Sequence, residues 1–172
     1  MMAHILAYAL LIGIIVFLCY DPSLGMFNRS GGRLLVVLLT LPCLLFGATL
    51  IFADVNRLKK INEATGNHLL TNALLKNGFR VRLGEWAWQV FGDEFGFVIW
   101  GDGAAFTQRI TRQLAAQSLT ESQRQVLIDA DGIDHLSATF AIVTNVRHIG
   151  RALGRGSVEV LAAKAARDGR RA

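Results

Sequence analysis

The chain has 172 residues, 52% of them hydrophobic, and a net charge of +5. This length leaves room for a short anchor and one soluble domain of roughly 110–120 residues, which is enough for a modest core. The only cysteines, Cys19 and Cys43, lie in two apolar segments, at positions too far apart for an intramolecular disulfide in a helical hairpin. Residues 54–84 carry a net charge of +4, residues 85–134 carry −5 and residues 135–172 carry +5.

The two apolar segments, residues 3–20 and 34–53, contain no Lys, Arg, Asp or Glu. Each is close to the length that a helix needs to cross a hydrocarbon layer about 30 Å thick. We therefore expect a transmembrane helical hairpin over residues 1–53, with spans at about 3–20 and 34–53. Residues 54–172 are then expected to form a soluble juxtamembrane and cytoplasmic domain.

The residues flanking these segments predict the orientation. The connection 21–33 has the composition of a turn and carries Arg29 and Arg33, whereas Arg57, Lys59 and Lys60 follow the second segment. This excess of positive charge predicts an integral protein of the inner or plasma membrane with both termini in the cytoplasm. The first segment has no basic region before it and no A-x-A cleavage site after it, so we expect it to be retained.

Two kinds of pattern follow in residues 54–100. Residues 54–77 have helical spacing and end near Gly78, whereas residues 79–100 alternate between polar and apolar and are rich in aromatic residues. The second stretch predicts a β-hairpin or a small meander, in which Asp93-Glu94 fits a turn. Trp86, Trp88 and Trp100 lie in it as a candidate aromatic interaction surface, and the alternative is that they form the core of the domain.

The remaining residues predict helices. A helix begins near Ala104, and Thr120-Glu121-Ser122-Gln123 matches a capping box that starts a second helix ending near Ala130. Asp134 would cap a longer helix over Leu136, Phe140, Val143, Val146 and Ile149, and Ser157 would open a last one. The expected fold class is a membrane α-helical hairpin of two transmembrane helices, followed by a small α+β cytoplasmic domain with a short β-hairpin and three or four helices.

Basic residues form the candidate binding site for an anionic partner or for lipid headgroups. Three arginines recur at i, i+4 and i+8, and three further cations follow the second apolar segment. The alternatives are that these charges fix the membrane topology or pair with the acidic middle segment. The candidate residues are Arg57, Lys59, Lys60, Arg147, Arg151 and Arg155.

An acidic cluster is the only candidate for chemistry. Asp129, Asp131, Asp134 and His135 lie close in sequence, but a turn and a helix cap explain two of them, and no second histidine has ligand spacing. We therefore predict no catalytic residue, no metal and no cofactor, and we expect that the chain is not an enzyme.

The leading hypothesis is a membrane-anchored accessory or assembly protein, whose basic cytoplasmic domain recruits or stabilises a larger membrane complex through protein–protein interaction. A bacterial secretion or conjugation machine is one setting. The alternatives are a membrane-tethered nucleic-acid-binding protein and a small membrane enzyme with an Asp/His site. The expected partners are membrane lipids, proteins of the complex and nucleic acid. A homo-oligomer is a further candidate, because Gly13 and Gly47 would let spans pack closely.

Overall fold

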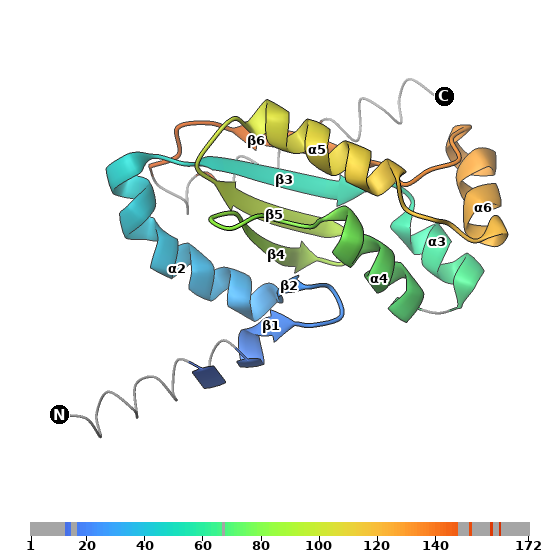
Figure 1. Cartoon of the computed structure of the whole chain (residues 1–172), viewed down its shortest axis with the longest axis horizontal. Helices are drawn as coiled ribbons and strands as arrows, with labels where there is room; N and C mark the ends of the chain where they lie inside the picture. The colour runs from blue at the N-terminus through green and yellow to red at the C-terminus, as the bar shows by residue number, and fades with distance from the viewer. Residues whose placement is uncertain are drawn as a thin grey trace.

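A mixed β-sheet forms the centre of the computed structural model (Figure 1), which describes residues 13–14, 17–66 and 68–147, together with the single positions 152, 159 and 162. Within these residues the sheet has six strands in the order β1-β2-β4-β5-β3-β6. The strands are β1 (Tyr20–Asp21), β2 (Met26–Phe27), β3 (Thr49–Val55), β4 (Trp86–Phe91), β5 (Glu94–Ile99) and β6 (Ala138–Val143). All neighbouring strands are antiparallel except β2 and β4.

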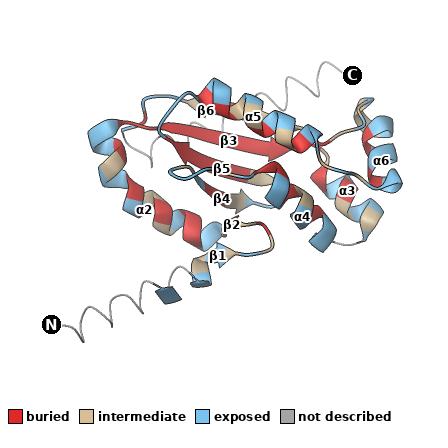
Figure 2. Ribbon diagram, in the orientation of Figure 1, coloured by how far each residue is buried: buried red, intermediate tan, exposed pale blue. Residues whose placement is uncertain are grey.

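Strand β3 is the most enclosed element, because every one of its residues is buried (Figure 2). It pairs with β5 on one side and β6 on the other, so that Leu50 lies opposite both Val98 and Val143. Side chains of a strand alternate between the two faces of a sheet. Leu50 and Phe52 therefore contribute to one hydrophobic cluster, and Ile51 and Ala53 contribute to the other.

Helix α2 (Arg29–Phe46) covers the first face. The side chain of Asn28 accepts a hydrogen bond from the Gly31 N–H at its start, and Gly47 ends it at a φ of 69°. Leu35, Leu39 and Cys43 recur at every fourth residue and are buried against the sheet. Gly32 lies so close to the Trp88 indole that a Cβ atom there would collide with it.

The predicted membrane hairpin is wrong. Residues 34–53 do not form one span: they divide at Gly47 between α2, which packs on the sheet, and the central strand β3. A strand covered on both faces is apolar at every position, so its sequence prolongs the apolar stretch of the helix before it. The predicted boundary between residues 53 and 54 falls inside β3, and most of residues 3–20 lie outside the described part of the chain.

Among the described residues, α2 alone is long and apolar enough to cross a membrane, by length and composition only. Core helices of globular domains meet the same criterion. Over the described residues the fold class is therefore α+β around one six-stranded sheet, in which residues 34–53 are not a membrane span.

The other face of the sheet carries α3 (Leu58–Thr65), α4 (His68–Gly78), α5 (Gly103–Ala115) and α6 (Glu121–Asp131). Helix α3 packs against α6, and α4 packs against α5. The rings of Phe79 and Phe95 lie beneath them, with their centroids 4.7 Å apart. This face places two turns, 82–85 and 92–93, beside helix surfaces, and both turns border cavities.

Two local predictions have different outcomes. The capping box is confirmed: the Thr120 hydroxyl accepts from the Gln123 N–H, and the Gln123 side chain accepts from the Thr120 N–H. The helix predicted from Asp134 through Ile149 is wrong over its described residues, because residues 138–143 form β6 and pair with β3. Phe140 and Val143 have helical spacing, but the β-branched residues between and beside them favour a strand.

Candidate functional site: an arginine-lined cavity

A tight turn between α4 and β4 builds the first part of the site. The Glu85 N–H donates to the Arg82 carbonyl at 3.0 Å, which closes a four-residue turn over residues 82–85. Gly84 has a φ of 85°, the conformation that the third position of a type II turn requires. Arg82 and Glu85 are thereby held at the two ends of one turn.

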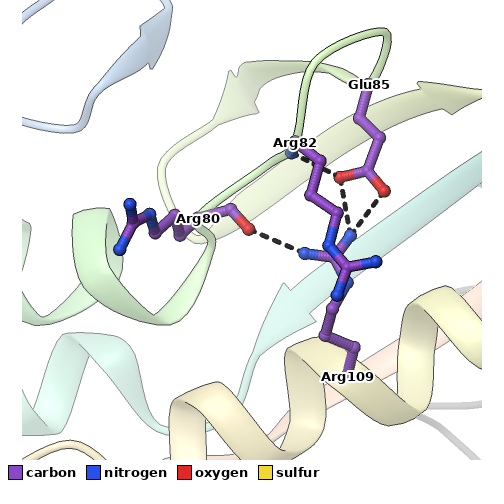
Figure 3. A network of polar contacts seen from close by, with 4 residues as sticks. All are labelled: Arg80, Arg82, Glu85 and Arg109. Atoms are coloured by element: carbon purple, nitrogen blue, oxygen red, sulfur yellow. Dashed lines mark hydrogen bonds and ion pairs between the residues drawn. The ribbon is translucent and has the colours of Figure 1, made fainter.

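Helix α5 brings Arg109 to this turn (Figure 3). Its Nη2 atom donates to both carboxylate oxygens of Glu85 at 2.6 Å, and its Nη1 atom donates to the Arg80 carbonyl at 2.9 Å. The Arg82 N–H also donates to Glu85 Oε2, at 2.7 Å. The side chains of Arg109 and Glu85 are only 17% and 18% exposed. Glu85 therefore fixes the Arg109 guanidinium in one orientation, whereas the Arg80 side chain points away from it.

A cavity of about 870 Å³ lies between the turn, the end of β5 and α5. We call it the arginine pocket. Arg82 and Arg112 are exposed, and Trp100 is 41% exposed at its edge. Asp102 caps α5 through a hydrogen bond from the Ala104 N–H. Its lining comprises Arg82, Leu83, Gly84, Glu85, Ile99, Trp100, Gly101, Asp102, Ala105, Phe106, Gln108, Arg109, Arg112, Gln113 and Ala116.

The arginine pocket suits an anion with aromatic parts. Arg82, Arg109 and Arg112 supply guanidinium groups, which bind phosphate oxygens through paired N–H donors. Trp100 offers a ring surface for a base to stack on. A fixed guanidinium in a partly shielded position binds an anion more strongly than a mobile one on the open surface, because less entropy is lost and the local dielectric constant is lower.

A second cavity, of about 830 Å³, lies beside the β4–β5 turn, and we call it the acidic-turn cavity. The Val55 N–H donates to the Asp93 carbonyl at 3.0 Å, which joins this turn to the end of β3. Asp54 is 1% exposed and lies opposite Glu94 in the strand register. The lining comprises Leu58, Lys59, Asn62, Glu63, Gly66, His68, Asn72, Leu75, Gln89, Gly92 and Asp93.

The acidic residues predicted to cluster are separated. Asp131 is 2% exposed and pairs with Arg57 at 2.9 Å, whereas Asp134 contacts His135 on the surface at 3.1 Å. The hydrogen bond from His135 lowers the pKa of Asp134. Over the described part of the chain, no three His, Cys, Asp or Glu side chains gather as a metal site would require.

The predicted basic residues are not brought together by the described part of the chain. Arg57 begins α3 and binds Asp131, Lys59 lines the acidic-turn cavity, and Lys60 is exposed on the same helix. Arg147 lies elsewhere, where it donates to the Leu44 carbonyl at 3.0 Å. Arg151 and Arg155 lie outside the described residues.

The three tryptophans occupy different environments. Trp88 is 4% exposed and packs against α2 in the core. Trp86 is 36% exposed, and its ring centroid lies 6.1 Å from that of Phe27. Only Trp100, beyond the end of β5, borders the arginine pocket.

The sequence does not predict the pair of Arg109 and Glu85. The alternation of residues 79–100 predicts a strand at residues 80 and 82, and Arg109 lies in the helix predicted from Ala104, where nothing singles it out. The available signal was Gly84 between Arg82 and Glu85, because a glycine in a short polar stretch indicates a turn. Nothing in the spacing indicates that Arg109, 24 residues from Glu85, meets it.

No family model matches the chain, and no curated protein matches it either. Solved structures do match. The diguanylate cyclase SiaD of Pseudomonas aeruginosa, solved with its activator SiaC, is 17% identical with a TM-score of 0.67, over 95% of this chain and 65% of that one. This chain thus spans just under two thirds of the SiaD chain.

Two further matches cover most of both chains. A diguanylate cyclase/phosphodiesterase from Caldicellulosiruptor saccharolyticus is 17% identical with a TM-score of 0.65, over 88% of this chain and 90% of that one. The coiled coil and GGDEF domain of DgcB from Caulobacter crescentus, in complex with c-di-GMP, is 13% identical with a TM-score of 0.65, over 93% of this chain and 87% of that one. The chain therefore has the fold of GGDEF domains.

The family name can be compared directly with the sequence. In one-letter code it spells Gly-Gly-Asp-Glu-Phe, and residues 91–95 of this chain are Phe-Gly-Asp-Glu-Phe. These residues form the β4–β5 turn beside the acidic-turn cavity. Phe91 stands where the name has its first glycine. Its ring is 63% exposed and lies 5.4 Å from the Arg29 guanidinium carbon.

The fold corrects the predicted function. The hypothesis of a non-enzymatic membrane assembly protein is contradicted, because the neighbours are GGDEF domains that are named as diguanylate cyclases or are solved with c-di-GMP. The predictions of membrane lipids as partners, of an integral inner-membrane location and of an oligomer through packed spans are contradicted with it. All of them depended on a two-span hairpin, and residues 34–53 do not form its second span.

Proposed function

We propose that this domain binds a cyclic dinucleotide, c-di-GMP, in the arginine pocket. The observation that carries the proposal is the convergence of Arg82, Arg109 and Arg112 on one cavity with Trp100 at its edge. Two of the structural neighbours are described as GGDEF domains in complex with c-di-GMP, which supports the choice of ligand.

The chemistry of the ligand matches that of the pocket. A cyclic dinucleotide carries two phosphodiester anions and two purine bases on a compact ring. Guanidinium groups recognise the phosphates, and Trp100 stacks on one base. Glu85 acts as a positioning residue, because its contacts hold Arg109 and the turn that carries Arg82.

The electrostatic setting also favours an anion. The Arg109 guanidinium is 17% exposed and paired with Glu85, so it contributes oriented N–H donors rather than net positive charge. Arg82 and Arg112 are exposed and carry no ion pair among the described contacts, so they add positive charge at the mouth of the pocket.

Turnover of a guanosine nucleotide is the second candidate function. The favouring observation is the Gly92-Asp93-Glu94-Phe95 turn, with Asp54 opposite Glu94 and the acidic-turn cavity beside it. Phe91 is evidence against turnover. A glycine at this position would leave space beside the turn, whereas the Phe91 ring and the Arg29 guanidinium that contacts it fill that space. We therefore favour binding over catalysis.

Isothermal titration calorimetry of the full chain with c-di-GMP tests the proposal. We expect saturable binding that Arg112→Ala weakens at least tenfold, because a charge-assisted hydrogen bond contributes about 1.5–3 kcal/mol. Arg124→Ala is the matched control: it removes the same charge from an exposed residue of α6 that pairs only loosely with Glu121, at 3.4 Å. Equal binding by both variants, or none by the wild type, would refute the proposal.

Incubation with GTP and Mg²⁺, followed by chromatography of the products, separates the two functions. Binding without product supports the preferred function. Formation of a cyclic product that Glu94→Gln abolishes, together with no binding in the arginine pocket, would establish the second candidate instead.

A further inference from the structure

One face of α2 is apolar and has no partner among the described residues. Leu35, Leu39 and Cys43 point to the sheet, but the opposite side carries large aliphatic side chains that are 42–70% exposed. Figure 2 shows buried and exposed bands alternating along this helix. We call this surface the outer α2 face, and its residues are Val37, Leu38, Leu41, Leu44 and Leu45.

The side chains of the outer α2 face carry no charge and no hydrogen-bonding group. Between Leu34 and Phe46 the helix contains no Asp, Glu, Lys or Arg. Its one hydroxyl, on Thr40, donates to the Val36 carbonyl at 2.7 Å within the helix. A partner recognised by charge or by hydrogen bonds would therefore find no complement here.

The exposed area is large enough for a specific contact. The five side chains of the face present on the order of 500 Å² of apolar surface. Two copies in contact would bury about 1,000 Å² in total, which is the minimum for a specific protein interface. Single exposed apolar residues are common on protein surfaces, but a continuous face of this size is not.

We propose that a second copy of this chain packs on the outer α2 face, with the two α2 helices antiparallel across a two-fold axis near Leu41. In a two-fold interface the same surface of both protomers is in contact. Like charges on that surface would repel each other near the axis, whereas an uncharged surface has no such repulsion. Val37 of one protomer then lies opposite the partner's Leu45.

The antiparallel direction follows from Arg33, the last charged residue before the face. It lies eight residues before Leu41, so an antiparallel pair brings it to the C-terminal end of the other helix, where the helix dipole is negative. In a parallel pair the two Arg33 side chains would lie side by side, and their positive charges would repel each other. The proposal is independent of the ligand in the arginine pocket, which lies on the other face of the sheet.

Sedimentation velocity of the full chain between about 1 and 100 μM tests the interface. We expect a dimer whose fraction rises with concentration, and a Leu41→Glu variant that stays monomeric across this range. Leu69→Glu is the matched control, because Leu69 is 70% exposed on α4 and lies outside the face. A monomeric wild type, or a Leu41→Glu variant that dimerises as the wild type does, overturns the proposal.

Cross-linking decides the outcome if Leu41→Glu does not fold. In a Cys19→Ser background, Leu41→Cys is expected to form a disulfide between protomers on mild oxidation, because the two positions meet near the axis. Leu83→Cys, at the fully exposed tip of the turn 82–85, is expected to form none. Equal cross-linking at both positions overturns the proposal. Binding of a monomeric chain to phospholipid vesicles that depends on Leu41 also overturns it.

Discussion

The two cavities are almost equal in volume but differ in how their charged groups are held. In the arginine pocket, Arg109 and Glu85 contact at 2.6 Å and are less than one fifth exposed. In the acidic-turn cavity, Lys59 and Glu63 are 3.8 Å apart and are 88% and 64% exposed. The first cavity holds its cation in place before a ligand arrives, whereas the second does not. Preorganisation of this kind distinguishes a binding site from a hollow of the same size.

Removal of one cation from each cavity is expected to give the largest contrast. Arg109→Ala should weaken c-di-GMP binding about 100-fold, because it removes charge-assisted hydrogen bonds of about 1.5–3 kcal/mol each. Lys59→Ala should leave the affinity unchanged. Calorimetric titration of both variants measures the contrast, and an equal loss in the two would show that the cavities do not differ as described.

Removal of the anions tests the difference in stability. Glu85→Gln should lower the free energy of unfolding by about 2 kcal/mol, since it leaves a shielded guanidinium without its counterion. Glu63→Gln should change it by less than about 0.5 kcal/mol, because an exposed pair contributes little. Urea denaturation of both variants provides the values. A Glu85→Gln variant as stable as the wild type would mean that the pair is not held as described.

The turn that carries Arg82 and Glu85 should be sensitive at Gly84. Gly84→Ala should cost about 1 kcal/mol, because the φ of 85° is unfavourable for a residue with a Cβ atom. No neighbouring atom lies within 4 Å of that Cβ, so the effect is confined to the backbone. Leu83→Ala, at the exposed tip of the same turn, is the control. Thermal unfolding of the two variants should separate them, and equal melting temperatures would be inconsistent with this turn geometry.

The smallest effect is expected at Trp100. Trp100→Phe keeps a ring for stacking and should weaken c-di-GMP binding only two- to threefold. It should also remove the change in tryptophan fluorescence on binding, whereas Trp86→Phe should retain that change. A fluorescence change that persists in Trp100→Phe would place the ligand away from this side of the arginine pocket.

Local signals in the sequence predicted several elements correctly. Thr120 and Gln123 form the predicted capping box, and residues 86–99 form the predicted hairpin, with Asp93 in its turn. These features depend on residues that are close in sequence, so their side-chain chemistry was sufficient to identify them.

The membrane anchor was predicted because apolar length alone does not separate two neighbouring elements. Gly47, with a φ of 69°, divides residues 34–53 into a helix and a strand, and a buried strand is as apolar as a span. The candidate site was missed for a different reason. Arg82, Glu85 and Arg109 meet only through the packing of α5 beside the turn, which no local spacing specifies.

A crystal structure of the full chain with c-di-GMP would show directly whether the ligand binds in the arginine pocket. We predict phosphate oxygens within hydrogen-bond distance of Arg109 and Arg112, and a base stacked on Trp100. We also predict that the contact between Glu85 and Arg109 remains intact. A ligand bound instead beside Asp93 and Lys59, with the arginine pocket empty, would contradict the proposed binding site.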